Sequence, residues 1–363
     1  MNTYKLEKKT KVILNSTAIF IAIILMMWAQ NSMSSYGLRI LNLIAINAIL
    51  AVSLNLINGI TGIFSLGHIG FMAVGAYTAS LLTLSVQQKQ QVFFLEPLIW
   101  PFNSIQLDFF SATIIGGLVA AFFGLLIAVP ALRLRDDYLA IATLGFSEII
   151  RIFANYSVSL TNGALGLKGL PNYTNIWWSF SFLALTTWFI VKLTNSTYGK
   201  QLKAIRDDEI AARAMGINVK KLRVIAFVVG SFFAGIAGSL MAHLLTTIDP
   251  KMFMFVQPTS VNILVMIVLG GLGSTSGAII GAIIITFLSE WLRFIEGDMN
   301  IFGHVFHGIP GMRMLIFSAL MVILMIFYRK GIMGEKEITW DYLYNLIMKF
   351  KKKAPVEAKV GEE

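Results

Sequence analysis

The chain has 363 residues and a mean hydropathy of +0.74, with 56% hydrophobic and only 13% charged residues, about half the charged fraction of typical soluble domains. It contains no cysteine, which excludes disulfides, thiolate nucleophiles and thiolate metal sites, and its four histidines show no zinc-binding spacing. The net charge of +10 suits either nucleic acid or a membrane, and the positions of the basic residues decide between them.

Apolar runs recur along the whole chain, and each approaches the ~20 residues that a membrane-spanning helix needs. They cover residues 12–31, 38–58, 60–86, 109–132, 138–156, 176–194, 224–247, 258–273, 276–294 and 312–328. The first run is longer than a signal-peptide core and lacks an A-x-A cleavage site, so we interpret it as a retained helix. The sequence predicts an all-α, polytopic helical bundle of about ten transmembrane helices.

The basic residues fall mainly on one side of these runs. With ten spans, both termini share a side, and that side receives 22 of the 29 Lys and Arg residues. The positive-inside rule then makes both termini cytoplasmic. The positive charge therefore predicts membrane orientation rather than binding to nucleic acid.

A glycine-rich stretch, GITGIFSLGHIGFMAVGAY (59–77), interrupts the third run. Glycine weakens a helix by up to ~1 kcal/mol relative to alanine, so a broken or re-entrant helix is expected. Irregular backbone at membrane depth is tolerated only against protein or a water-filled path. Ser65, Gly67, His68 and Gly70 are therefore candidates for a translocation path. The other interpretation is that the glycines only allow close helix contact and that His68 is an ordinary packed polar residue.

Small residues recur at every fourth position in three runs, which predicts close helix packing. These residues are Gly116, Ala120 and Gly124, then Ala234, Gly238 and Ala242, then Gly277 and Gly281.

Glu148 and Arg151 lie three residues apart within the run 138–156. An intrahelical ion pair is the simplest account of both residues. Because ionisable groups inside a membrane are functional candidates by default, Glu148 is also a candidate for the path. Glu290 and Arg293 repeat this spacing near a helix end, where the side chains can reach the interface.

The segment 203–223, KAIRDDEIAARAMGINVKKLR, is charged although it lies between two apolar runs, on the predicted cytoplasmic side. Acidic side chains at a helix start can accept free backbone N–H groups and oppose the positive end of the helix dipole. Here the acidic residues are Asp207, Asp208 and Glu209. Gly216 is well placed to end the helix in a left-handed turn.

Between these ends lie the strong helix formers Ala211, Ala212 and Ala214. The segment predicts a two-turn helix with a thin, alanine-lined surface, which can lie deep in a groove on a partner. The other interpretation is a solvated interfacial loop. No P-loop, H-E-x-x-H or G-x-S-x-G motif is present, so no enzyme signature stands out.

From about residue 38 to 334 the sequence resembles the M-type permease subunit of the high-affinity branched-chain amino acid ABC importers. Five blocks carry the resemblance: NLINGITGIFSLGHIGFMAVGAY, LRLRDDYLAIATLGFSEIIR, LTNGALGLKGLP, LKAIRDDEIAARAMGINVKKLRVIAFVVGSFFAGIAGSL and VLGGLGSTSGAIIGA. The DDYLAIATLGFSEIIR block favours the M-type subunit over its H-type partner.

In such permeases an E-A-A…G segment docks on the ATPase, and here E-I-A-A-R-A-M-G occupies it with an inserted Ile210 and no trailing L-P. The ATPase-coupling residues that the resemblance implies are Arg206, Asp207, Asp208, Glu209, Ala211, Ala212 and Gly216.

The resemblance implies a heterodimer with an H-type permease, two ATP-binding cassette subunits and an extracytoplasmic substrate-binding protein. ATP and magnesium would be bound by the ATPase subunits, with no cofactor, metal or catalytic residue in this chain. It also implies uptake of leucine, isoleucine or valine across the inner membrane of a prokaryote. The alternatives are other amino acids, urea, amides or sugars, an ion-coupled secondary transporter, or an intramembrane enzyme.

We expect a permease domain over residues 1–334 and a cytoplasmic tail over 335–363. In ITWDYLYNLIMKFKKK (338–353), apolar residues at helical spacing precede three lysines, which suits an amphipathic helix on the anionic inner leaflet.

Overall fold

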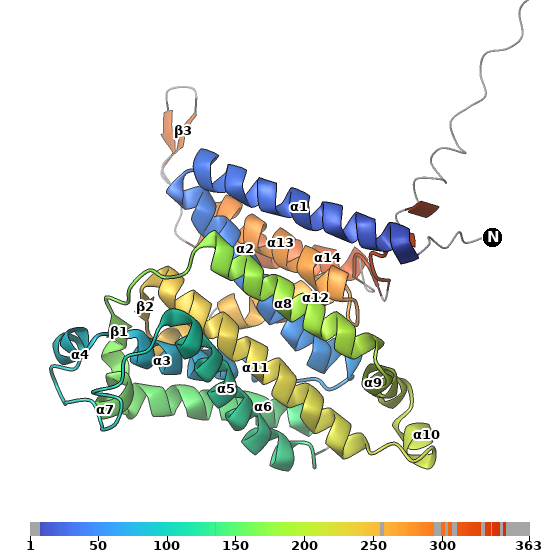
Figure 1. Ribbon diagram of the computed structural model, residues 1–363, viewed down its shortest axis with the longest axis horizontal. Helices are drawn as coiled ribbons and strands as arrows, with labels where there is room; N and C mark the ends of the chain where they lie inside the picture. Colours follow the sequence, from blue (N-terminus) through green and yellow to red (C-terminus); the bar gives the residue numbers. More distant parts are fainter. Residues whose placement is uncertain are drawn as a thin grey trace, which may run out of the picture. The chain divides into compact units, whose positions relative to one another are not determined.

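The computed structural model describes residues 8–134, 136–254, 258–293, 299–301, 304–306, 311–327, 331–334, 336–341 and 344–345. The described chain is almost entirely helical (Figure 1). The elements are α1 (Lys8–Ser32), α2 (Ser35–Asn55), the π-helical η1 (Leu56–Ile60), α3 (His68–Thr83), α4 (Val86–Val92), α5 (Phe109–Ala131), α6 (Asp136–Tyr156), α7 (Val158–Thr161), η2 (Gly163–Leu165), β1 (Leu167–Lys168), α8 (Ile176–Asn195), α9 (Thr197–Asp207), α10 (Glu209–Ala214), α11 (Val219–Leu245), β2 (Thr247–Ile248), η3 (Pro250–Phe253), α12 (Pro258–Gly270), α13 (Thr275–Trp291), β3 (Met299–Ile301), β4 (His304–Phe306) and α14 (Met312–Phe327). The pairs β1–β2 and β3–β4 are antiparallel.

Every predicted apolar run contains a helix, which confirms a polytopic helical membrane protein. Six helices of the described chain are long and apolar enough to cross a membrane, and shorter apolar helices accompany them. The six cover Lys9–Ser32, Ser35–Ile60, Phe109–Ala131, Tyr138–Tyr156, Ile176–Asn195 and Val219–Leu245. The count of about ten spans and the cytoplasmic position of both termini stay predictions.

The chain divides into two compact units, one of Ser34–Glu335 and one of Met1–Met33 with Lys336–Glu363. Within the smaller unit, Lys11 Nζ lies 2.5 Å from Asp341 Oδ2, and Trp340 Nε1 donates a hydrogen bond of 2.6 Å to Asn15 Oδ1. The C-terminal segment therefore contacts the first turns of α1. Most of the predicted amphipathic tail lies outside the described residues, and the division at residue 334 stays a prediction.

Polar side chains immediately before the long helices accept backbone N–H groups of the first turn, which otherwise have no partner within the helix. These capping residues are Ser34 for α2, Asp108 for α5, Asn175 for α8, Asn218 for α11 and Ser274 for α13. The helix starts are thus encoded locally by Ser, Asp and Asn.

Helices α3, α5 and α11 of the larger unit approach one another backbone to backbone. A Cβ added to Gly75 would lie 2.2 Å from the carbonyl oxygen of Gly235, and one added to Gly116 would lie 2.9 Å from that of Gly75. A Cβ on Gly238 would lie 2.0 Å from the carbonyl oxygen of Met72. This confirms the predicted packing through small residues at Gly116 and Gly238. Gly75 and Gly235, which the four-residue spacing did not select, also belong to this contact.

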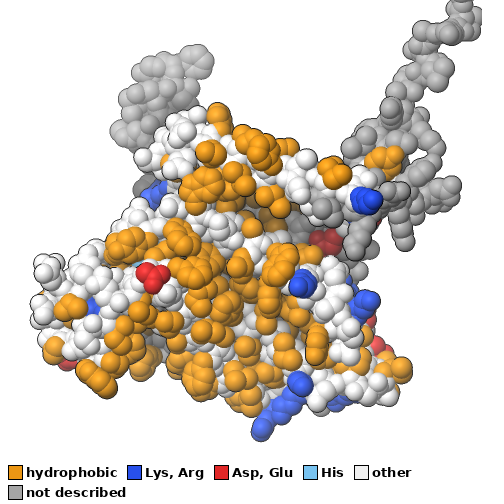
Figure 2. Space-filling view, viewed as in Figure 1, with side chains coloured by type: hydrophobic (Ala, Val, Ile, Leu, Met, Phe, Trp, Pro, Cys, Tyr) orange, Lys and Arg blue, Asp and Glu red, His pale blue; other side chains and the backbone are white. Residues whose placement is uncertain are grey.

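The two ends of the larger unit differ in structure. Helices α9 and α10 lie at one end, and α4, α7 and the β1–β2 pair lie at the other (Figure 1). Between these ends, large apolar side chains are exposed on α5, α6 and α8, among them Phe122, Ile149 and Trp188 at 60%, 60% and 62%. The apolar surface of Figure 2 is what a bundle in contact with lipid requires.

A buried lysine stabilises the loop between α4 and α5. Lys89 is 2% exposed, and its ammonium donates to the carbonyl oxygens of Phe102 and Ile105 at 2.7 and 2.5 Å. Burial lowers the pKa of Lys89. The two carbonyl groups satisfy the charge, which explains how a lysine can lie inside this loop.

Candidate functional site

The charged segment forms the predicted short helix, α10. The Asp208 side chain accepts hydrogen bonds from the backbone N–H groups of Ile210 and Ala211 at 2.9 and 3.0 Å, so it caps the helix start. Asp207 does not share this role, because it ends α9 and accepts two bonds of 3.0 Å from the guanidinium of Arg206.

The other end of α10 is closed by a left-handed turn at Gly216, as predicted. Its φ is +80°, a conformation that strongly favours glycine. Gly216 N–H donates to the Arg213 carbonyl at 3.0 Å, and Ile217 N–H donates to the Ala212 carbonyl at 3.1 Å. This bond pattern is the Schellman motif, which satisfies carbonyl groups that the helix leaves free.

The surface of α10 differs in part from the predicted alanine-lined surface. Ala212 is only 4% exposed, because it packs against the rest of this chain. Ile210 and Met215 are each 82% exposed. Glu209 is held by Arg213 and, at 2.9 Å, by Arg223 Nη2. The protruding apolar side chains are therefore Ile210 and Met215. Ile210 is marked in the sequence as the residue inserted into the E-A-A pattern.

One residue of the predicted coupling set reaches from α9 into the bundle. Arg206 Nη1 donates to the carbonyl oxygen of Gly59 in η1 at 3.3 Å. Beside it, Gly273 N–H donates to Asn55 Oδ1 at 2.9 Å. These four residues, Asn55, Gly59, Arg206 and Gly273, are called the Arg206 junction below. They join α9, the end of α2 and the turn between α12 and α13.

The Arg206 junction has no spare volume. A Cβ on Gly59 would lie 2.3 Å from the backbone nitrogen of Gly273. Gly273 itself has a φ of +90°, and a Cβ there would lie 2.9 Å from Arg206 Nη1. Glycine is therefore required on both sides of the guanidinium, and a displacement of α9 presses directly on η1 and on the α12–α13 turn.

The predicted break in the third run is confirmed. After η1 the backbone is non-helical until α3 begins at His68. The Asn58 amide exchanges two hydrogen bonds of 3.2 Å with the backbone of Ser65, and Leu66 N–H donates to Thr143 Oγ1 at 3.1 Å. Side chains thus satisfy backbone groups that the break exposes, as a break at membrane depth requires.

The glycine-rich stretch combines the predicted break with close helix contact, which was the other interpretation of its glycines. A Cβ on Gly67 would lie 2.3 Å from the Thr143 carbonyl oxygen, and one on Gly70 would lie 2.9 Å from Ser147 Cα. These two glycines therefore bring the broken segment against α6, as in the close-contact interpretation. The break and the close approach occur in the same stretch.

Ser65 and His68 are buried together beside this break. His68 Nε2 lies 2.9 Å from Ser53 Oγ, whereas Ser65 Oγ and His68 Nδ1 are buried without a partner among the described residues. Both residues line a cavity of about 10 Å³, which is roughly the volume that one water needs. The arrangement can hold a water, and the role of these residues in a path stays a prediction.

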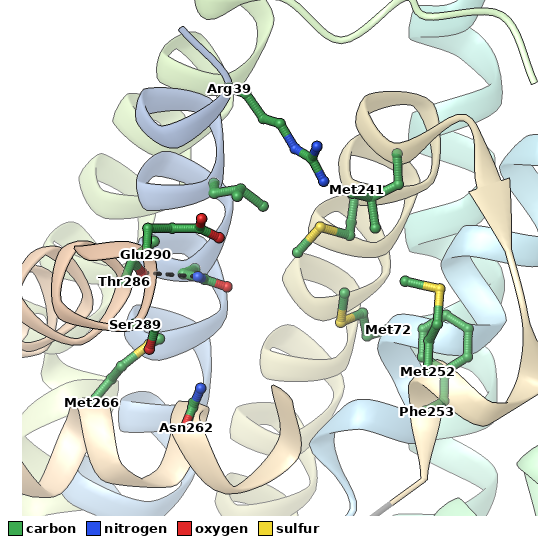
Figure 3. Close-up of a pocket in the computed structure, with 13 residues that line it drawn as sticks. Arg39, Met72, Met241, Met252, Phe253, Asn262, Met266, Thr286, Ser289 and Glu290 are labelled. Atoms are coloured by element: carbon green, nitrogen blue, oxygen red, sulfur yellow. Dashed lines mark hydrogen bonds between the residues drawn. The ribbon is translucent and has the colours of Figure 1, made fainter. Parts of the chain in front are cut away.

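The predicted ion pair on α6 is confirmed, with Arg151 Nε 2.6 Å from Glu148 Oε2. Neither Glu148 nor the candidates around the break line a second cavity, of about 230 Å³. That cavity lies between α2, α3, α11, η3, α12 and α13 (Figure 3). Its lining includes Arg39, Glu290 and four methionines, which the sequence analysis did not select.

A multi-pass helical bundle with a broken helix, an internal cavity and a capped helix beyond its spans has the structure of a membrane permease. The sequence model described as the permease component of the branched-chain amino acid transport system matches residues 36–327. The chain belongs to this family.

Individual relatives agree with this membership. The chain is 31% identical to the high-affinity branched-chain amino acid transport permease LivM of Escherichia coli, over 86% of this chain and 74% of the relative. It is 30% identical to LivM of Salmonella typhimurium, over 78% and 67%. Identity to LivH of Salmonella typhimurium is lower, at 25% over 66% and 79%. The chain is thus more similar to the M-type than to the H-type permease, as its sequence blocks predicted.

Proposed function

We propose that this chain is the M-type permease subunit of an ATP-driven importer and forms, with an H-type permease, the translocation path for leucine, isoleucine and valine. Two ATP-binding cassette subunits hold ATP and magnesium, and an extracytoplasmic binding protein delivers the substrate. The chain itself catalyses no reaction and lies in the inner membrane of a prokaryote. Membership of the permease family and the greater similarity to LivM support this proposal.

The observation that carries the proposal is the construction of α10. This helix is fixed at both ends by Asp208 and Gly216, yet it exposes Ile210 and Met215 at 82% each. Exposed apolar side chains on a short, rigid helix are suited to docking into a groove on a partner. A solvated loop would need neither the two caps nor the apolar groups.

The Arg206 junction supplies a route by which a docked ATPase acts on the spans. Arg206 lies two residues before the α10 cap, and its guanidinium contacts η1 beside the α12–α13 turn. A movement of α10 is therefore passed to the ends of α2 and α13 through close backbone contacts rather than through a flexible linker.

An ion-coupled secondary transporter is less well supported. Such a mechanism needs an intramembrane carboxylate that gains and loses its counter-ion during transport. The two carboxylates predicted within the spans are each held by an arginine, Glu148 by Arg151 at 2.6 Å and Glu290 by Arg293 at 3.5 Å. The first pair lies within α6, and in the second Arg293 lies just after the end of α13, so the partners of each pair are three residues apart and movement between helices would not separate them.

The test is uptake by vesicles that contain the two permeases, the ATPase subunits and the binding protein. We expect ATP-dependent uptake of leucine, isoleucine and valine, with little uptake of urea or ribose. A vesicle without ATP but with a proton or sodium gradient is the control. Uptake driven by the gradient alone would contradict the importer, and ATP-driven uptake of only urea or a sugar would contradict the substrate.

A further inference from the structure

The cavity of about 230 Å³ has two walls of different chemistry. Arg39 of α2 and Thr286, Ser289 and Glu290 of α13 lie across the cavity from methionines of α3, α11 and η3 (Figure 3), and Asn47 of α2 also lines the cavity. Asn47 Nδ2 donates to Thr286 Oγ1 at 2.9 Å, which joins the two polar helices. Such walls match a compact ligand that has a charged part and an apolar part.

The two charges of the cavity are held apart. Arg39 points into the cavity and makes no hydrogen bond or ion pair with any described residue (Figure 3). Glu290 accepts a bond of 3.1 Å from the Tyr36 hydroxyl and lies 3.5 Å from Arg293 Nη1, which orients its carboxylate. A guanidinium without a partner among the described residues and an oriented carboxylate on one cavity favour a ligand with one negative and one positive group.

The opposite wall suits an apolar side chain of variable shape. It is formed by Met72, Met241 and Met252 with Phe253, and Met266 lies at the base (Figure 3). Methionine is unbranched and polarizable, so it adapts to differently branched aliphatic groups better than a β-branched residue does.

We propose that this cavity binds the free amino acid during its passage, with Arg39 on the α-carboxylate, Glu290 on the α-ammonium group and the methionines around the aliphatic side chain. This assignment rests on the proposed function, because it requires that the chain carries amino acids. A sugar or urea has no charges to meet Arg39 and Glu290. A compound with only one of the two charged groups makes only one of these two contacts, which weakens its binding.

The place of the cavity fits delivery at one end and ATPase action at the other. Arg39 and Asn55 are separated by about 24 Å of α2, at 1.5 Å per residue. Asn55 belongs to the Arg206 junction, on the predicted cytoplasmic side, so Arg39 near the other end of α2 lies toward the extracytoplasmic side. Helix α2 therefore lines the cavity and ends at the junction, and α13 lines the cavity and begins two residues after Gly273 of the junction.

The test uses the absence of cysteine from this chain, so that Ser289→Cys places its one thiol in the cavity wall. In the full complex in vesicles, the labelling rate of this subunit by a methanethiosulfonate reagent is measured with and without leucine. We expect leucine at about tenfold its Kd to slow labelling by about tenfold, because only the unoccupied fraction of the cavity then leaves the thiol open to the reagent. We expect no protection by 4-methylpentanoate, which lacks the ammonium group, or by 3-methylbutylamine, which lacks the carboxylate.

Arg39→Gln and Glu290→Gln should each abolish the protection, and Arg39→Lys, which keeps the charge, should retain part of it. Lys251→Gln removes an exposed charge from η3 outside the cavity lining and should leave protection unchanged. Assembly is checked by co-purification of the partner subunits. Leucine uptake without protection of Ser289→Cys, or equal protection in the Gln variants, would overturn the assignment. Absence of leucine uptake by the unmodified complex would instead show that the proposed function is wrong.

Discussion

Replacing Arg206 with alanine should separate ATP hydrolysis from transport. The change removes the 3.3 Å bond to the Gly59 carbonyl, the aliphatic stem that lies beside Gly62 and the guanidinium that lies beside Gly273. Hydrogen bonds of charged groups contribute ~1.5–3 kcal/mol, and the length of this bond with the 23% exposure of the side chain argues for about 1.5 kcal/mol. A free energy of that size corresponds to about a tenfold change in an equilibrium between two states of the bundle.

The assay is the number of leucine molecules taken up per ATP hydrolysed by the reconstituted complex. We expect Arg206→Ala to lower this ratio by about tenfold while the ATPase subunits still co-purify, because the exposed surface of α10 is intact. Lys200→Ala removes a positive charge from an exposed position of the same helix and serves as the matched control. An unchanged ratio in Arg206→Ala would refute the reasoning that the Arg206 junction transmits movement.

Three further changes test other parts of the structure. Ile210→Asp places a charge on the exposed apolar surface of α10, so insertion should be normal while co-purification of the ATPase subunits falls. Gly216→Val puts a β-branched residue at a φ of +80°, which should cost the α10 turn about 1–2 kcal/mol and reduce uptake, whereas Gly216→Asn should be tolerated better. Gly75→Val would place a Cβ 2.2 Å from the Gly235 carbonyl oxygen. The purified complex should therefore lose more stability to heat than the ~1–3 kcal/mol of an ordinary overpacked core. Thermal unfolding at the parental temperature would contradict the close packing of α3 on α11.

The ends of α10 show which features are predictable from sequence. Asp208 caps the helix through N–H groups two and three residues later, and the turn at Gly216 closes it through the bonds of Gly216 N–H and Ile217 N–H to the carbonyl groups of Arg213 and Ala212. Such bonds involve neighbours in the chain, so residue type alone indicates them. The Glu148–Arg151 pair was predictable for the same reason, because both partners lie on one helical face.

The exposed surface of α10 was predicted less well. Alanine at position 212 suggested a thin docking surface, but Ala212 faces its own chain and Ile210 faces outward. A six-residue helix has too few positions for a periodic pattern to mark its buried side. Which side is covered depends on where α9 and α11 hold the segment, and that is a tertiary contact.

The amino-acid sequence by itself determined the helical membrane class, the positions of the apolar runs, the break before His68 and the limits of α10. Tertiary structure alone decided that Arg206 meets Gly59, 147 positions away in the chain, and that Arg39 and Glu290 line one cavity. The physical reason is that a helix in lipid is apolar on all sides, so hydropathy does not reveal which side faces another helix. The close approach of backbones at glycine brings these remote residues together.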